Sequence, residues 1–508
     1  MTEPGRRPAI AVVGGGIAGL AAAWELTGGA DGPEQESPAV VLVEAAERLG
    51  GKLRSEPFAG TVVDVGPDGF LGRRPEAEQL CREVGLGDRL TPIGAAGATV
   101  WVGGRARPLP GSLAMGVPTR FLPTARSGIL GPAGTARLLF DVVAPRPDRR
   151  GPLGDRAVGP LVARKLGRRV VTRLVDPLVG GIYAGAVDDA SAAAVYPLLL
   201  AAAQRRGSFL RALRRSSDDR PSDDRASTSG PTASPAFWAV DGGLGLLAVR
   251  LAAALSARGV EIRTGCPVER LEPPGTSADR WTVHTATGPV AVDGVVLATP
   301  AGPAAALLDP HDAEAANLLR AIEYAAVGVV TLELAPGAVP DELPGTGMLF
   351  PPDTRLPDSA ADALGGPADG RLLVTACTFL SRKWPHLAGP DHVLVRASVG
   401  RFGDRRFAEL ADDALVARVS AELGALLGTG GAGRPTDAQV TRWDEALPQY
   451  RVHHLLRVAG IEAALERLPA ITVTGAAYRG VGIPACIAGG RAAARLLRRR
   501  LEGVPATT

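Results

Sequence analysis

Cysteine and histidine are scarce in this chain of 508 residues, which has four cysteines and six histidines. No two cysteines have the Cys-x-x-Cys spacing, so the sequence predicts neither a zinc site nor a redox-active pair. We expect four reduced and mostly buried thiols. No two histidines have the His-x-x-x-His spacing, and we therefore expect no metal site.

Long apolar runs and an excess of one charge are also missing. The longest apolar stretch, residues 192–203, contains Pro197 and is too short to cross a bilayer. Residues 1–7 are too short and too polar for a signal peptide. The 56 basic residues nearly balance the 53 acidic ones, and a net charge of +3 does not require a nucleic-acid partner. We expect a cytoplasmic protein without a transmembrane segment.

Residues 9–26 have the pattern of a dinucleotide-binding strand, loop and helix. Residues 9–13 are apolar and β-branched, which predicts a buried parallel strand, and residues 20–26 are strong helix formers. The glycines between them have the Gly-x-Gly-x-x-Gly spacing, which permits a tight turn, close approach of a pyrophosphate and close packing of helix on sheet. The N-terminus of the helix attracts phosphate groups. The predicted cofactor-binding residues in this loop are Gly14, Gly15, Gly16, Ile17, Ala18 and Gly19.

An acidic residue follows the next predicted strand. Residues 39–43 are apolar and end in Glu44, and a carboxylate at that strand end binds a ribose 2′-hydroxyl and repels a 2′-phosphate. The alternative is an ordinary turn without a ligand, but the order of strand, loop, helix, strand and acid favours a cofactor. We assign Glu44 and Ala45 to the cofactor site.

The stretch Arg48–Ser55 distinguishes between cofactors. It contains a second glycine pair and Lys52, which a nicotinamide enzyme does not need. It resembles the second motif of the FAD-dependent amine oxidase superfamily. The turn in Thr61–Phe70, the stretch Trp443–Tyr450 and the run Tyr478–Arg491 extend the similarity nearly end to end, and the chain resembles the porphyrinogen oxidases of this superfamily.

The resemblance implies an α/β fold with a discontinuous Rossmann-like FAD-binding domain, an α+β substrate domain and a helical insert. Residues 216–234 are rich in Ser, Asp and Arg without apolar periodicity, which predicts a disordered loop. The expected boundaries are 1–90, 235–303 and 448–508 for the FAD-binding domain, 91–215 for the helical substrate-entrance insert, 216–234 for the loop and 304–447 for the substrate domain.

The resemblance also implies one FAD per chain. The cofactor is expected to be non-covalent, because no Cys or His lies in a recognised flavin-linkage motif. The turn at residues 66–69 is expected to touch the flavin, with a plain hairpin turn as the alternative, and Val268 is expected to pack on the adenine. The further cofactor-binding residues are Gly51, Lys52, Gly66, Pro67, Asp68, Gly69, Val268, Trp443, Val481, Gly482 and Ile483.

The implied reaction is oxidation of a porphyrinogen with molecular oxygen as acceptor. Six electrons leave the substrate in three two-electron cycles through FAD, and oxygen is reduced to hydrogen peroxide. We assign no catalytic base, because no Ser/His/Asp or paired-carboxylate pattern is evident. We also expect transient contact with neighbouring enzymes of haem biosynthesis.

Coproporphyrinogen III is the expected substrate, because a tetra-acid needs more cations at the pocket rim. Protoporphyrinogen IX is the alternative, and an amine oxidase or a carotenoid-type desaturase is a further one, although 4% aromatic residues argue weakly against an amine-binding aromatic cage. Each candidate propionate partner has a solvated surface charge as its alternative role, and Met348 and Leu349 have a place in the core as theirs. The substrate candidates are Arg73, Lys383 and Arg396 for the propionates and Gly347, Met348 and Leu349 for the apolar pocket, with Arg382 adding a further cation.

Overall fold

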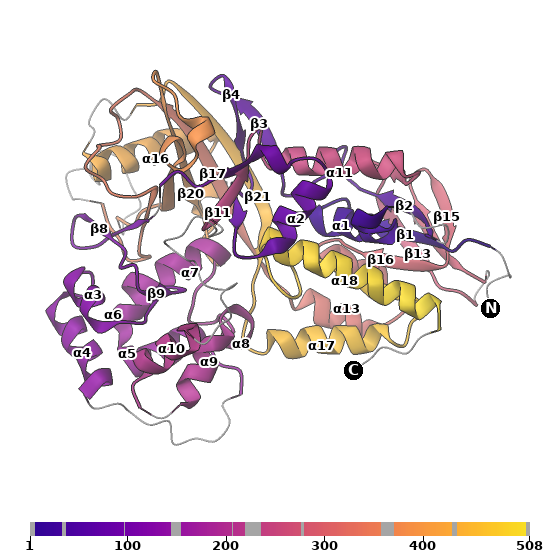
Figure 1. Ribbon diagram of the computed structural model, residues 1–508, viewed down its shortest axis with the longest axis horizontal. Coiled ribbons are helices and arrows are strands. Elements are labelled where there is room, and N and C mark those ends of the chain that lie inside the picture. The colour runs from indigo at the N-terminus through magenta and orange to yellow at the C-terminus, as the bar shows by residue number, and fades with distance from the viewer. Residues whose placement is uncertain are drawn as a thin grey trace.

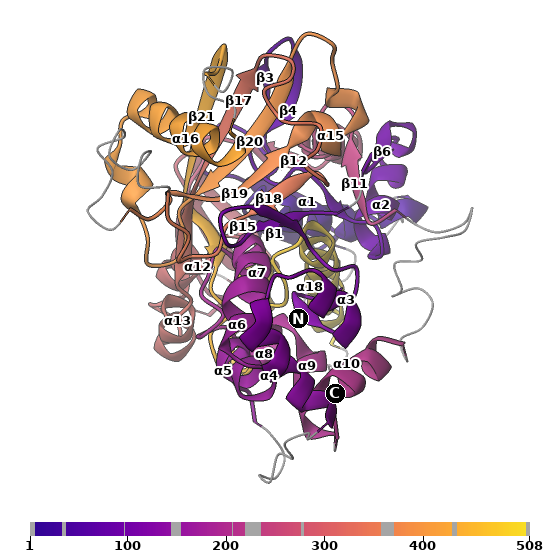
Figure 2. The ribbon, with the colours of Figure 1, turned by 90° about the vertical axis from the view of Figure 1, so that its left-hand side faces the viewer.

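The computed structural model describes residues 6–32, 37–95, 97–143, 154–205, 207–218, 235–275, 279–356, 370–428 and 434–503. Two sheet-based parts lie side by side, and a group of helices lies below the larger sheet (Figure 1). A quarter turn brings these helices, α3 to α10, in front of the viewer beneath the strands (Figure 2).

A five-stranded parallel sheet forms from short β-branched runs, which are apolar on both faces because other layers cover both faces. Side chains alternate along its central strand, so that Ile10 and Val12 lie in one core and Ala11 and Val13 in another. Across the sheet the strands are β12 (Glu261–Arg263), β2 (Ala39–Val43), β1 (Ala9–Val13), β16 (Gly294–Leu297) and β22 (Ile471–Val473). The expected α/β, Rossmann-like fold is confirmed.

Helices cover one face of this sheet, and a small antiparallel sheet with further helices covers the other. Helices α1 and α18 pack most closely, since a Cβ atom on Gly490 would lie 2.1 Å from the backbone oxygen of Ala18. The first layer contains α1 (Ile17–Leu26), α2 (Pro75–Glu83), α11 (Gly245–Ala257) and α18 (Ile483–Leu501). The second contains β13 (Val268–Glu272), β14 (Trp281–Thr285), β15 (Gly288–Val292), α12 (Ala301–Leu308), α13 (Ala313–Arg320) and α17 (His454–Leu465).

The larger sheet is mixed and has seven strands. Helix α16 (Asp412–Leu427) packs on it through Leu415, Val419 and Leu423. Across the sheet lie β21 (Asp437–Pro448), β17 (Tyr324–Leu334), β20 (Val393–Val399), β19 (Val374–Phe379), β18 (Gly347–Leu349), β7 (Thr99–Trp101) and β8 (Ala106–Pro108).

The position of the β7–β8 hairpin corrects one boundary. The hairpin was expected in the helical insert at 91–215, but β7 pairs in parallel with β18 and extends the larger sheet. This pairing joins residues about 250 positions apart, so no local pattern in the sequence indicates it.

The helices of the insert enclose a core of their own. They are α3 (Phe121–Arg126), α4 (Gly131–Val143), α5 (Val158–Leu166), α6 (Arg168–Val170), a π-helical turn (Val171–Val175), α7 (Asp176–Tyr183), α8 (Ala192–Val195), α9 (Pro197–Gln204) and α10 (Phe209–Asp218). Helix α10 runs to Asp218, so the first three residues of the predicted disordered loop are helical; residues 219–234 lie outside the described residues. Among the described residues we find no helix with the length and apolar character that a bilayer crossing requires.

Four short strands complete the part that matters for the site. They are β3 (Ser55–Phe58) and β4 (Thr61–Asp64), which form a hairpin, and β5 (Phe70–Leu71) and β6 (Leu90–Pro92), which flank β11 (Phe237–Val240). Strand β4 leads directly into the turn at residues 66–69. The short helix α15 (Leu380–Lys383) follows β19 at the edge of this region.

Candidate cofactor and active site

Each glycine of the loop between β1 and α1 has a separate steric role. Gly14 has φ +106°, a backbone conformation that favours glycine. A Cβ atom on Gly19 would lie 1.9 Å from the backbone oxygen of Gly14, so only glycine lets the helix approach the strand. A Cβ atom on Gly16 would meet nothing within 4 Å, and Gly16 caps α1 without a side-chain hydrogen bond. The N-terminus of the helix therefore faces open space that a pyrophosphate fits.

Glu44 lies where a ribose-binding carboxylate is expected. Its Oε2 accepts a hydrogen bond from the amide of Gly15 at 2.6 Å, and its Oε1 accepts one from the amide of Ala46 at 2.9 Å. Two carboxylate oxygens offer about four acceptor positions, so these bonds leave room for ribose hydroxyls. Ala45 lies between the strand end and this second contact.

The second glycine pair lies against the first loop. The amide of Gly50 donates to the backbone oxygen of Gly15 at 2.8 Å, and a Cβ atom on Gly51 would lie 3.2 Å from Cα of Gly16. Lys52 follows, and its burial lowers the pKa of its ammonium group. A Cβ atom on Gly66 would lie 1.9 Å from the backbone oxygen of Lys52. Three glycine-rich segments therefore converge at one place.

The turn at residues 66–69 is held from several sides. Asp68 Oδ2 accepts hydrogen bonds from Lys383 Nζ at 2.7 Å and from Trp384 Nε1 at 3.2 Å. Burial by itself would raise the pKa of the Asp68 carboxyl, but the charges of Lys383 and Arg396 outweigh it and hold that pKa well below its usual range. Trp443 Nε1 donates to the backbone oxygen of Val65 at 2.9 Å, directly before the turn and Pro67.

A second glycine-capped helix approaches from the far end of the sequence. Gly482 caps α18 without a side-chain hydrogen bond, and Ile483 begins the helix. The Tyr450 hydroxyl donates to the backbone oxygen of Ala476 at 2.6 Å and accepts from the amide of Gly480 at 2.7 Å, which holds the loop in front of the helix. This N-terminus can stabilise negative charge on a reduced flavin.

Val268 and Val481, the remaining residues predicted to bind the cofactor, pack against two different cores. Val268 begins β13 and packs against the core beneath the parallel sheet, on the side where Glu44 ends β2. Val481 packs against the core of the helical insert together with Leu349 and Tyr183. Residues from the loop before α18, the larger sheet and α7 therefore pack against the same core.

The substrate candidates are not equally placed. Met348 is 1% exposed and lies in the core of the larger sheet, which agrees with the alternative position expected for it from the sequence. Leu349 faces the opposite side, because side chains alternate along a strand, and lies 3.6 Å from the position of a Cβ atom on Gly181 of α7. The Gly347 backbone oxygen accepts from the Thr99 hydroxyl at 3.1 Å, a bond between strands.

The candidate cations also differ in the contacts that they make. Arg73 is partly exposed between β5 and α2. Lys383 is paired with Asp68, and Arg396 donates to the backbone oxygen of Asp64 at 3.4 Å. Arg382 donates to the backbone oxygens of residues 339, 340 and 343. Lys383 and Arg382 are therefore engaged within the protein, which removes the support that these two cations were expected to lend to the tetra-acid substrate.

Two residues of this region were not assigned from the sequence. Trp384 is 1% exposed and follows Lys383, and Tyr450 is the last residue of the Trp443–Tyr450 stretch. Tyr450 stacks on His454 with ring centroids 3.9 Å apart. Burial raises the pKa of Tyr450, and burial lowers the pKa of His454 to about 4. Neither group has the properties of a base near neutral pH, and no catalytic base is assigned.

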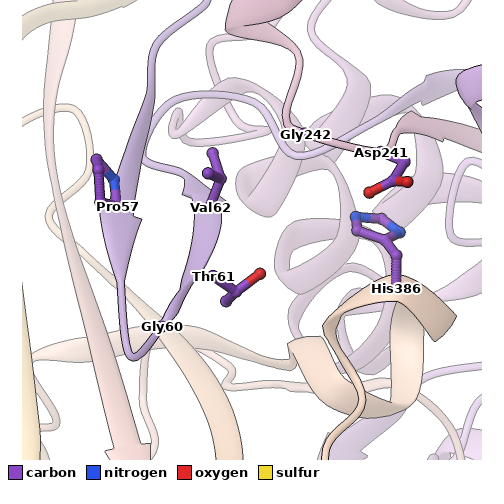
Figure 3. A pocket seen from close by; sticks show the side chains of 7 residues that line it. All are labelled: Pro57, Gly60, Thr61, Val62, Asp241, Gly242 and His386. Carbon is purple, nitrogen blue, oxygen red and sulfur yellow. The ribbon is translucent and has the colours of Figure 1, made fainter.

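A groove of about 500 Å³ lies apart from the residues predicted for the cofactor. Asp241 and His386 lie close together on one side of it, opposite the residues of the β3–β4 hairpin (Figure 3). Its lining residues are Pro57, Gly60, Thr61, Val62, Asp241, Gly242 and His386. None of these is a candidate site residue, so the groove does not define the cofactor site.

Comparisons with known proteins extend over nearly the whole chain. The family model described as flavin containing amine oxidoreductase matches residues 17–498. Coproporphyrinogen III oxidase of Propionibacterium freudenreichii subsp. freudenreichii is 34% identical over 95% of this chain and 89% of that protein. Protoporphyrinogen oxidase of Macaca fascicularis is 29% identical over 96% of this chain and 97% of that protein. A crystal structure from Exiguobacterium sp. 255-15, assigned as a protoporphyrinogen oxidase, has a TM-score of 0.81 at 29% identity and covers 98% of this chain and 99% of that chain.

Proposed function

Because the chain belongs to the flavin containing amine oxidoreductase family and is an FAD-dependent oxidoreductase, we propose that it oxidises coproporphyrinogen III to coproporphyrin III in haem biosynthesis. The observation that carries this proposal is the similarity to coproporphyrinogen III oxidase along 95% of the chain. We further propose oxygen as the electron acceptor, the cytoplasm as the location and transient contact with neighbouring enzymes of the pathway.

The geometry supports a site in which the protein holds the cofactor and the substrate in position, and the cofactor supplies the redox chemistry. When bound, FAD would supply two-electron redox chemistry, with oxygen as the proposed final acceptor. Gly16 leaves open space before the N-terminus of α1, which fits a pyrophosphate, and Gly482 caps the N-terminus of α18, whose positive end suits the flavin ring. The partly buried side chains of Leu349, Val481 and Tyr183, which pack against the core of the helical insert, are of the apolar kind that a macrocycle pocket needs.

The substrate is tested by comparing kcat/KM for coproporphyrinogen III and protoporphyrinogen IX with the same FAD-loaded preparation. We expect a clear preference for the tetra-acid, and formation of the porphyrin with peroxide release. A preference for protoporphyrinogen IX would support the alternative, the substrate named for the Macaca enzyme that is 29% identical to this chain. Turnover of neither would move the protein to another activity of the superfamily. Acid should release free FAD, because we assign no covalent link.

A further inference from the structure

We propose that Lys383 and Trp384 are positioning residues for the cofactor, because they hold the turn at residues 66–69 in place by donating together to Asp68. This inference rests on the proposed function and on the placement of the flavin beside that turn. It gives Lys383 a different role from the propionate partner that the sequence suggested.

The two donors, Lys383 and Trp384, are adjacent residues at the end of α15, and both bond to the turn. Lys383 Nζ lies 2.7 Å and Trp384 Nε1 lies 3.2 Å from the same oxygen of Asp68. The Trp384 ring also fills the space beside the next residue, since a Cβ atom on Gly69 would lie 2.7 Å from it. The turn is therefore held by an ion pair, a hydrogen bond and a close steric contact.

The ammonium of Lys383 is enclosed rather than offered to a ligand. The Lys383 side chain is 16% exposed and that of Asp68 is 22% exposed. Lys383 Nζ lies 4.9 Å from the Trp384 ring centroid and 5.8 Å from that of Phe237, distances at which an aromatic face attracts a cation. The backbone of Lys383 is held as well, because its oxygen accepts from the amide of Gly94 at 2.9 Å.

A second cation ties the same strand end to the larger sheet. Arg396 of β20 donates to the backbone oxygen of Asp64, the last residue of β4. Lys383 and Arg396 lie 315 and 332 residues from their partners. The part that carries the substrate surface therefore sets the position of the flavin turn.

The test is a double-mutant cycle of Lys383→Met and Asp68→Asn, with the FAD dissociation constant of the apoprotein as the first readout. Each single change leaves a polar or charged partner unpaired, and we expect each to weaken FAD binding by about tenfold or more. The double variant should bind FAD no more weakly than the worse single variant, because both changes remove one interaction. Lys383→Arg should restore part of the affinity.

Two further readouts separate positioning from general stability. The visible absorption and reduction potential of the bound flavin should change in Lys383→Met, while KM for the porphyrinogen should stay within about threefold. Trp384→Phe removes the N–H donor and part of the ring that lies beside Gly69, and it should shift the flavin spectrum in the same direction even if Lys383→Met does not fold. Arg74→Ala is the matched control, because Arg74 forms a partly exposed ion pair with Glu76 a few residues after the same turn in the sequence.

The inference would be overturned if Lys383→Met left FAD affinity and spectrum unchanged and raised KM, which would make Lys383 a substrate contact. Strict additivity in the cycle would also overturn it. The Glu44→Ala variant tests the placement of FAD independently of the role of Lys383. If Glu44→Ala weakens FAD binding and Lys383→Met does not, only the positioning role is wrong; if neither does, the placement of FAD is wrong as well.

Discussion

Two segments proposed to bind the cofactor, the loop at residues 14–19 and the turn at residues 66–69, each follow a strand and are rich in glycine. The first is held by its own neighbours: Gly19 packs on Gly14, and Glu44 of the adjacent strand accepts from Gly15. The second is held by Lys383 and Trp384, more than 300 residues away. The comparison shows that similar composition can be shaped by local sterics in one place and by tertiary contacts in another.

The largest expected effect comes from breaking the local loop with Gly19→Ala. The added Cβ atom would lie 1.9 Å from the Gly14 backbone oxygen, and the strand and helix must separate. We expect destabilisation of about 1–3 kcal/mol or more together with loss of FAD binding. Thermal unfolding of the apoprotein and an FAD titration measure the two effects.

Gly16→Ala is the matched control, because its Cβ atom would meet nothing in the protein within 4 Å. We expect the apoprotein to unfold at the wild-type temperature while FAD binds more weakly, since the methyl group enters the space of the pyrophosphate. Equal stability of the Gly19→Ala and Gly16→Ala variants would show that the loop is not held by this local contact.

The next prediction tests whether Glu44 binds the ribose of FAD. Glu44→Ala should weaken FAD binding by about 1.5–3 kcal/mol, because charge-assisted hydrogen bonds to the ribose are lost. The bonds to Gly15 and Ala46 are lost as well, so Glu44→Gln, which keeps an acceptor without the charge, should show a smaller loss. An unchanged FAD dissociation constant in Glu44→Ala would contradict the ribose role.

The last prediction concerns the pH dependence of stability, through Asp64 at the end of the strand before the turn. Burial raises the pKa of Asp64 to about 7, against the hydrogen bonds from Ser55 Oγ at 2.5 Å and the amide of Leu244 at 2.8 Å. Asp68 raises that pKa further, and Arg396 lowers it. The folded protein therefore keeps a proton that an unfolded aspartate releases near pH 4, so this contribution to stability is lost as pH rises toward about 7.

Asp64→Asn should remove this contribution while keeping an acceptor at the same place. We expect its unfolding temperature, relative to that of the wild type, to rise between about pH 4 and about pH 7 and to level off above that. The low pKa of Asp68 acts below this window and leaves the comparison intact. Asp444→Asn, an exposed partner of Arg405, is the control. A constant difference between wild type and Asp64→Asn across this range would contradict the raised pKa.

Secondary structure and the cofactor loops were largely predictable. The strands of the parallel sheet, helix α2 with its N-terminal Pro75, the β7–β8 hairpin and the long terminal helix α18 lie where apolar periodicity and turn residues placed them. These patterns act over a few residues, and the burial of both faces of β1 follows from its unbroken apolar run. The pairing of β7 with β18 was not predictable, because it depends on a meeting of distant strands.

The substrate residues show the same division. Met348 and Leu349 are neighbours with similar side chains, yet one is in the core and the other faces α7. Which of the two faces the core depends on the register of β18 between β19 and β7. Lys383 looked like a surface cation in the sequence, and its partner became visible only with the fold.

The sequence by itself determined the α/β class, the glycine loop with its acidic partner and the resemblance to FAD-dependent enzymes. Glycine spacing, strand hydrophobicity and a carboxylate at a strand end are local properties, and their physical effects depend on nearby residues alone. Only the tertiary structure decided that Lys383 and Trp384 meet Asp68 and that Met348 is core. Charges and side-chain faces take their roles from the partners that folding brings to them, and those partners lie hundreds of residues away.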